Sequence, residues 1–288
     1  MGLYQVKRTF HIIFCCIAGI SFLAQTSHAQ EQNLRIISLA PATTEILYSL
    51  GLEAQIVGVS TFCNYPPQVK EKAKVGSFSQ PNIEMILYLQ PDIIFCTGLE
   101  QARAVVQLRH LGLRVHVSDP KNLQELLESV IKIGDITGKK PQASELVQHM
   151  RENIEQLNIL TKDIPVEKRP RVFLEIWHDP LMTAGKGSFV DVMITAAGGV
   201  NIAHETPRPY SYFNAEEVLY RNPQCLILTY MSRQKPLERM RKRLGWNAVD
   251  AVRDGRIYND IDPNLILRAG PRIVEGLQEL YKRFYPYT

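Results

Sequence analysis

The stretch TGKKPQASELVQHMRENIEQLNILTKD, residues 137–163, predicts one uninterrupted helix of about six turns. Its apolar residues recur at steps of three and four and form a single stripe: Ala143, Leu146, Val147, Met150, Ile154, Leu157 and Leu160. Pro141 suits a first helical turn, and Pro165 follows just past the expected end. Such a helix, packed along two lobes, would hold their mutual angle, whereas a long surface helix of one domain would not.

Strand-like and helix-like segments alternate on both sides of this helix. Before it, we expect strands at 35–40, 55–60, 91–96 and 114–118, and helices at 42–50, 82–89, 101–111 and 122–136. After it, we expect strands at 171–177, 225–230 and 256–259, and helices at 188–197, 215–221, 237–244 and 271–284. Continuous apolar strands separated by helices predict mainly parallel sheets covered on both faces. The predicted fold class is α/β, with two parallel-sheet lobes, 30–137 and 164–288, joined by one long backbone helix over 138–163.

One segment of each lobe resembles the other. Residues 82–95 align with residues 214–227 at a constant offset of 132, and Asn, Glu, Leu, Tyr and Pro match between them. A shared helix–turn–strand pattern explains part of this match. The remainder indicates pseudo-twofold lobes related by duplication.

The first 29 residues have the pattern of a cleaved secretory signal. Basic residues precede the apolar run 12–24, and Ser27-His28-Ala29 offers small residues at the positions a signal peptidase reads. The run is shorter than the roughly 20 residues that a spanning helix needs. Cys15 and Cys16 lack the small residues that precede a lipidated cysteine, so no lipid anchor is expected. We therefore expect a cleaved secretory signal, with cleavage near Ala29–Gln30, and a secreted mature protein.

Composition narrows the class of partner. The chain carries 33 basic and 29 acidic residues, a near-neutral balance that argues against nucleic acid. Three cysteines follow the signal, Cys63, Cys96 and Cys225, without metal-type spacing. Because their number is odd, at least one thiol is unpaired, and the sequence leaves open whether the other two pair.

The sequence lacks the common motifs of catalytic sites. The segment 184–188, AGKGS, resembles a phosphate loop, but the Walker pattern needs an earlier glycine and a hydroxyl directly after the lysine, where Gly187 stands. No G-x-S-x-G elbow, H-E-x-x-H pair or G-x-G-x-x-G turn occurs in the sequence. The histidines that follow the signal are scattered over both lobes. We therefore predict no catalytic residue, no metal site and no resident cofactor.

Aromatic residues follow several of the expected strands in loops. They are Phe62, Tyr65, Phe78, Trp177, Tyr210 and Tyr212. In α/β sheets ligands bind outside the carboxyl ends of the strands, so these loops would face one ligand cleft between the lobes. Flat apolar rings there suit a large, partly planar ligand. For any single ring, packing within its own lobe is the alternative.

An ordered series of segments carries a resemblance to a known family. The segments are 35–47, 57–60, 65–67, 82–84, 89–94, 171–174, 183–185, 198–202 and 269–272. Over essentially the whole mature chain they resemble the helical-backbone periplasmic binding proteins of ABC importers, with the nearest likeness to cobalamin-binding receptors. The resemblance implies a monomeric receptor, not an enzyme, that captures a corrinoid of the vitamin B12 type and delivers it to membrane permease subunits.

The resemblance also implies site residues. Combined with Trp177 from the strand-end aromatics, the predicted ligand-binding set is Phe62, Phe78, Trp177, Met182, Tyr210, Asn264 and Arg268. Met182 stands where an aromatic residue is expected, Asn264 where an aspartate is, and Thr97 replaces an aromatic residue. These departures keep the type of pocket but leave haem, a ferric siderophore and a transition metal as alternative ligands. An α/β enzyme is the least favoured interpretation.

Glu84 and Glu216 occupy matching positions of the duplicated segment. Each follows by two residues an asparagine that could cap a helix, where the helix dipole favours a carboxylate. Helix stabilisation is therefore one explanation. In the resembled receptors, paired glutamates are docking points for arginines of the membrane subunits. A two-fold symmetric permease needs matching charges on two equivalent surfaces, so the constant offset favours docking.

Overall fold

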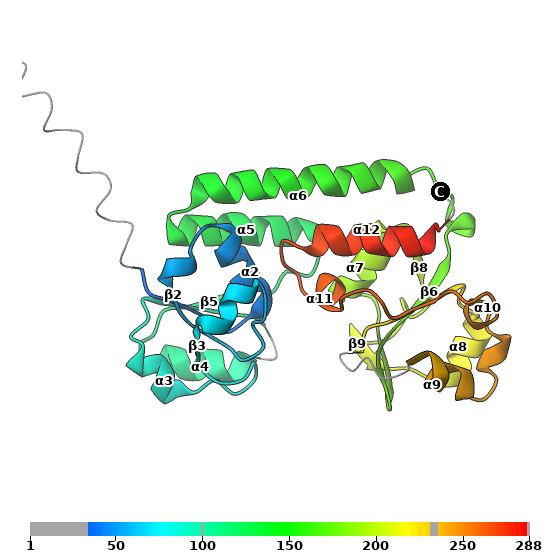
Figure 1. Cartoon of the computed structure of the whole chain (residues 1–288), viewed down its shortest axis with the longest axis horizontal. Coiled ribbons are helices and arrows are strands. Elements are labelled where there is room, and N and C mark those ends of the chain that lie inside the picture. The colour runs from blue at the N-terminus through cyan, green and yellow to red at the C-terminus, as the bar shows by residue number, and fades with distance from the viewer. Residues whose placement is uncertain (1–33, 99–100, 231–235, 287–288) are drawn as a thin grey trace, which may run out of the picture.

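A computed structural model describes residues 34–98, 101–230 and 236–286 of the chain. The predicted signal peptide lies outside these residues. Two α/β lobes lie side by side beneath a layer of long helices (Figure 1). In the part of the chain that the structure describes, no helix combines the length and apolar character needed to cross a bilayer.

The N-terminal lobe is built on a five-stranded sheet in which every pair of neighbours is parallel. In sheet order the strands are β3 (Ala73–Lys74), β2 (Ile56–Val59), β1 (Ile36–Ser38), β4 (Ile93–Cys96) and β5 (Val115–Val117). The helices are α2 (Pro41–Ser49), α3 (Ile83–Tyr88), α4 (Ala102–His110) and α5 (Leu123–Thr137), with 3-10 turns at Glu53–Gln55 and Pro67–Glu71. β1 and β4 are fully buried, as expected of continuous apolar runs.

The C-terminal lobe has a six-stranded sheet of mixed direction. The strands are β6 (Arg171–His178), β7 (Leu181–Ala184), β8 (Val200–Asn201), β9 (Tyr210–Tyr212), β10 (Cys225–Leu228) and β11 (Ile257–Tyr258). The helices are α7 (Phe189–Ala196), α8 (Ala215–Arg221), α9 (Pro236–Lys242), α10 (Asp250–Arg253), α11 (Asn264–Leu267) and α12 (Ile273–Phe284), with 3-10 turns at Val166–Lys168 and Trp246–Ala248. The order is β11-β10-β6-β7-β9, with β8 also paired to β6. β7 and β9 are antiparallel to their neighbours, an extension that the sequence analysis did not predict.

The long helix α6 spans Lys140–Thr161 and is shorter at both ends than the predicted 137–163. Thr137 is the last residue of α5, and Gly138 caps that helix at φ 72°, a left-handed conformation that glycine adopts without steric cost. Leu160 was predicted to face the core, which was wrong: its side chain is 54% exposed, and Thr161 is buried in its place. The other predicted stripe residues are buried or partly buried against the core.

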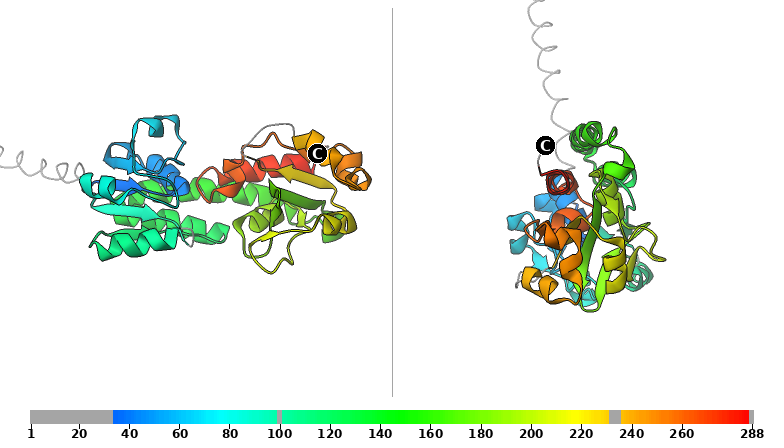
Figure 2. Two further views of the ribbon diagram at one scale, coloured as in Figure 1. Left: turned by 90° about the horizontal axis from the view of Figure 1, so that it is seen from below. Right: turned by 90° about the vertical axis from the view of Figure 1, so that its right-hand side faces the viewer.

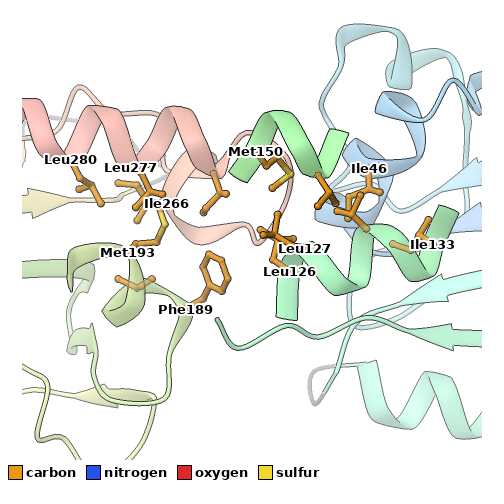
Figure 3. Close-up of a cluster of buried hydrophobic side chains, with 14 of the residues drawn as sticks. Ile46, Leu126, Leu127, Ile133, Met150, Phe189, Met193, Ile266, Leu277 and Leu280 are labelled. Carbon is orange, nitrogen blue, oxygen red and sulfur yellow. The ribbon is translucent and has the colours of Figure 1, made fainter. Parts of the chain in front are cut away.

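One hydrophobic core passes through both lobes and the helix layer. It includes Ile46 of α2, Leu126 of α5, Met150 of α6, Met193 of α7 and Leu277 of α12 (Figure 3). Views at right angles agree that α12 runs beside α6 (Figure 2). Because protein interiors are close-packed, bending one lobe towards the other must disturb this shared packing. The prediction of two α/β lobes joined by one long helix is confirmed.

Candidate ligand-binding site

Phe62 and Phe78 form the aromatic group of the N-terminal lobe. They lie in the loops after β2 and β3, at the carboxyl ends of parallel strands. Their ring centroids are 6.2 Å apart with the planes at 67°, an edge-to-face arrangement that aromatic pairs favour. Phe62 is exposed and Phe78 half-buried, so the pair offers ring surface outside the sheet.

A buried glutamine holds the Phe78 loop. The Nε2 of Gln101 donates to the carbonyl of Phe78 at 2.7 Å and to that of Leu39 at 3.1 Å, and its Oε1 accepts from the amide of Thr97 at 2.8 Å. Gln101 is almost fully buried, so these bonds satisfy both ends of an amide that would be costly to bury alone. The sequence does not point to this residue, because two of its three partners are distant in the chain. Its only local signal is a polar residue at the start of the α4 pattern.

Two arginines from the C-terminal segment reach into the N-terminal lobe. Glu45, a buried carboxylate on α2, accepts from Arg272 at 2.9 Å on each oxygen and from Arg268 at 3.3 Å. Arg268 also donates to the side chain of Asn64 at 2.7 Å and to the carbonyl of Phe62 at 3.3 Å. The guanidinium of Arg268 therefore ties the Phe62 loop to the other lobe. In the sequence, the only hint of this ion pair is that Glu45 is a charged residue among the apolar positions of α2.

Arg272 also covers Tyr65. Its guanidinium carbon lies 3.7 Å from the centroid of the tyrosine ring, within the range of a cation–π contact. Burial opposes the charge of Arg272, but hydrogen bonds and attraction from Glu45 outweigh it and raise the pKa of the guanidinium. One face of Tyr65 is thus occupied by the protein itself.

The C-terminal lobe presents a row of side chains across three antiparallel strands. Trp177 of β6 pairs with Met182 of β7, and Met182 pairs with Tyr212 of β9. Tyr210 pairs with Ala184 two residues further along the same strands. Opposed residues of an antiparallel pair point to one face, as do residues two apart. The predicted loop residues Tyr210 and Tyr212 thus lie in a strand, on one face with Trp177 and Met182, and β9 lies at the edge of this lobe nearest the other lobe (Figure 1).

A second buried carboxylate supports this row from behind. Glu175 of β6 accepts from Arg243 at 2.7 and 2.6 Å and from the hydroxyl of Tyr230. Burial raises the pKa of Glu175, and the bonds from Arg243 oppose that rise. The ring of His178 contacts that of Trp177, with centroids 5.2 Å apart, and that of Tyr230, with centroids 5.5 Å apart. The end of β6 that carries Trp177 is therefore fixed by charge and by ring contacts.

Asn264 begins α11 and is engaged locally. Its side-chain Nδ2 and its backbone amide both donate to Oδ1 of Asp262, at 2.8 and 3.0 Å. The structure thus joins Arg268 to the Phe62 and Phe78 group, and Met182 to the Trp177 and Tyr210 group. It shows no bond from Asn264 to either. Over the described ranges, no cluster of three or more His, Cys, Asp or Glu side chains could hold a metal ion.

Glu84 and Glu216 lie on the exposed faces of α3 and α8. Asn82 caps α3 by accepting from the amide of Met85 at 3.0 Å, and Asn214 caps α8 by accepting from the amide of Glu216 at 2.8 Å. Both glutamates are in the first turn, where the helix dipole favours a carboxylate. The capping expected from the sequence is confirmed, and both carboxylates face outward from their lobes.

The chain is similar to known proteins along most of its length. A family model described as "Periplasmic binding protein" matches residues 36–263. The uncharacterized ABC transporter substrate-binding lipoprotein YvrC of Bacillus subtilis (strain 168) is 34% identical over 264 residues, which cover 90% of this chain and 82% of YvrC.

Two solved structures share the architecture. The periplasmic vitamin B12 binding protein BtuF of Vibrio cholerae aligns with a TM-score of 0.78 at 26% identity, covering 88% of this chain and 96% of BtuF. The periplasmic heme-binding protein RhuT of Roseiflexus sp. RS-1, in its apo form, aligns with a TM-score of 0.79 at 25% identity, covering 88% and 98%. With a family model matched over most of its residues, this chain belongs to the periplasmic binding protein family.

Proposed function

We propose that this protein captures a corrinoid in the periplasm and delivers it to the membrane subunits of an ABC importer, without catalysing a reaction. The observation that carries the proposal is the pair of aromatic groups, one in each lobe. Phe62 and Phe78 offer rings from the N-terminal lobe, and the other lobe offers one face that carries Trp177, Met182, Tyr210 and Tyr212. Small-molecule sites are mainly apolar and aromatic, with few polar groups. Two broad apolar surfaces suit the two faces of a large macrocycle.

Polar groups beside these surfaces fit the rim of such a ligand. A corrinoid carries amide side chains around its ring, which hydrogen-bond donors and acceptors can bind. Tyr210 lies on the same face as Met182 and Tyr212, Arg268 holds the Phe62 loop, and Asn264 is the third polar residue of the predicted set. The similarity to a vitamin B12 binding protein agrees with this choice.

Haem is the second candidate, and one observation favours it. Met182, Tyr210 and Tyr212 share one face of β7 and β9, and a thioether and a phenolate are both side chains that bind haem iron. The similarity to a heme-binding protein points the same way. A corrinoid would use these side chains for packing alone, whereas haem would use at least one as a ligand to iron.

Calorimetric titration of the mature protein separates the candidates. We expect cyanocobalamin to bind in a one-to-one complex, more tightly than a haem, a ferric siderophore or zinc. Tight binding of haem with none of cyanocobalamin would replace the corrinoid by haem. Binding of zinc alone would replace both with a metal.

Glu84 and Glu216 are proposed as the docking points for cations on two equivalent membrane subunits. Glu84→Lys and Glu216→Lys should leave ligand affinity unchanged and abolish uptake, because juxtaposed like charges at an interface cost several kcal/mol. If the glutamates only complement helix dipoles, their change to Gln should lower stability by about 0.3–1 kcal/mol and leave uptake intact. Normal uptake by the double Lys variant would exclude docking at these positions.

A further inference from the structure

The helices α3 and α8 end in the same unusual way. Gln90 follows α3 at φ 46° and Asn222 caps α8 at φ 43°, and they are the two non-glycine residues with positive φ among those the structure describes. They are separated by the same offset of 132 residues that relates the two segments in sequence. Residues other than glycine rarely adopt this left-handed backbone conformation. The repeat therefore extends from residue types to backbone geometry.

An arginine at the start of each central strand clamps this turn. Arg35 donates through Nε to the carbonyls of residues 89 and 90, at 3.0 and 3.2 Å. Arg171 donates through Nε to the carbonyls of residues 221 and 222, at 3.2 and 3.0 Å. These carbonyls terminate the helices and have no further helical partner. Each clamp fixes its helix against the sheet, so the outer faces of the two helices are set by equivalent bonds.

The two helices also match in which of their positions are buried and which are exposed. Ile86 of α3 and Val218 of α8, at the same offset, are fully buried. Tyr88 and Tyr220, also at that offset, are 80% and 87% exposed. Each tyrosine is four residues after the glutamate of its helix, and residues four apart lie side by side on a helix surface. Both lobes therefore present a carboxylate next to a bare phenol ring.

Building on the docking role proposed for Glu84 and Glu216, we propose that Tyr88 and Tyr220 are a second pair of contacts with the membrane subunits of the importer. The partner is a two-fold related pair of surfaces, each with an arginine. A guanidinium can pair with the carboxylate through its N–H groups and stack on the neighbouring ring. Tyrosine is enriched at protein interfaces because it adds apolar area and a polar tip. In Figure 1, α3 and α8 lie one in each lobe on the side away from α6, so one partner surface can meet both.

The test uses Tyr88→Ala, Tyr220→Ala and the double variant of the full chain. Each replaces the endogenous copy in cells, and uptake of radiolabelled cyanocobalamin is measured beside ligand affinity and melting temperature of the purified protein. We expect uptake to fall at least about tenfold in the double variant, since lost aromatic anchors commonly weaken interfaces by that much. Ligand affinity and melting temperature should not change, because both rings are exposed. The double Tyr→Phe variant, which keeps the rings, should retain uptake.

Leu160→Ala is the matched control, because it truncates an exposed apolar side chain on α6 and should leave uptake unchanged. Normal uptake by the double Ala variant, when Glu84→Lys and Glu216→Lys abolish uptake, would overturn the tyrosine contacts and leave the docking role of the glutamates in place. A double Ala variant that lost ligand affinity along with uptake would also overturn the proposal. If the unaltered chain neither bound nor restored uptake of cyanocobalamin, the proposed function would fail first and this inference with it.

Discussion

The helices α3 and α8 match in their capping asparagines and in the left-handed turns that follow them, whereas the aromatic groups of the candidate ligand site are built differently in the two lobes. The capping asparagines, the turns and the carbonyls that an arginine clamps repeat at one offset in the helices. The aromatic groups consist of loops after parallel strands in one lobe and an antiparallel extension in the other. Under the proposed function, the two lobes are alike on the surfaces that would dock with two equivalent membrane subunits and different on the surfaces that would contact the ligand.

The buried carboxylates Glu45 and Glu175 also differ in where their partners come from. Glu175 pairs with an arginine of its own lobe, whereas Glu45 pairs with two arginines from the other end of the chain. The first positions the row that carries Trp177. The second makes the Phe62 loop depend on the C-terminal segment.

The largest expected effect is that of Glu45→Ala on stability. Removing this carboxylate leaves Arg268 and Arg272 without their shared partner, and an uncompensated buried charge typically costs about 3–5 kcal/mol. Urea denaturation should therefore show a large fall in the free energy of unfolding. Lys121→Ala, which removes an exposed partner of Asp119, should cost at most about 1 kcal/mol. Equal losses in the two variants would mean that Glu45 does not hold the arginines.

A smaller effect is expected on ligand affinity. Phe62→Ala and Tyr210→Ala should each weaken binding by about 2 kcal/mol, roughly thirtyfold, because each removes stacking area on one side of the ligand. Tyr220→Ala should leave affinity unchanged, since this ring is on the outer face of α8. Titration calorimetry measures all three. A loss in only one lobe would place the ligand against that lobe alone, and no loss in either would move the site elsewhere.

The smallest effect separates the two matched turns. Gln90→Gly should stabilise the protein by about 0.5 kcal/mol, because relief of left-handed strain exceeds the entropy cost of glycine. Asn222→Gly should destabilise it by about 1 kcal/mol, since the side chain of Asn222 accepts from the amide of Asp250 at 2.8 Å. Thermal denaturation of both variants is the measurement. Stabilisation by Asn222→Gly would show that the bond to Asp250 contributes little, and destabilisation by Gln90→Gly would show that its turn carries little strain.

Local periodicity was sufficient to predict most of the fold. Four of the five strands of the N-terminal lobe, its helices and the helix α6 follow from apolar runs and a stripe at helical spacing, whereas the two-residue strand β3 is too short to give a pattern. The antiparallel strands were missed because β7 and β9 are short and flanked by Pro180, Pro207 and Pro209, which indicate loops. The helix start was misplaced because Gly138 was included in the helix and not read as the cap of α5.

The site was harder to predict because its supports are remote in sequence. The aromatic residues could be named from their places after strands, and Tyr212 needed the register of β9 to join the row. The partners of Arg268 lie more than 200 residues away, and those of Gln101 up to 62. No local pattern encodes such pairs. Only the buried charge of Glu45 on an apolar helix face hinted at one.

The shared core beneath α6 has a mechanical consequence. The helices α5, α6 and α12 pack together along one side of the molecule, and α3 and α8 lie on the opposite side. A displacement of α3 or α8 would therefore rotate its lobe about this helix layer. A force applied at the two helices in the proposed complex would act as a torque on the packing of α5, α6 and α12. Deforming this packing would raise the free energy of the protein, so the lobes would return to their original angle once the force is released. A flexible hinge would not return them.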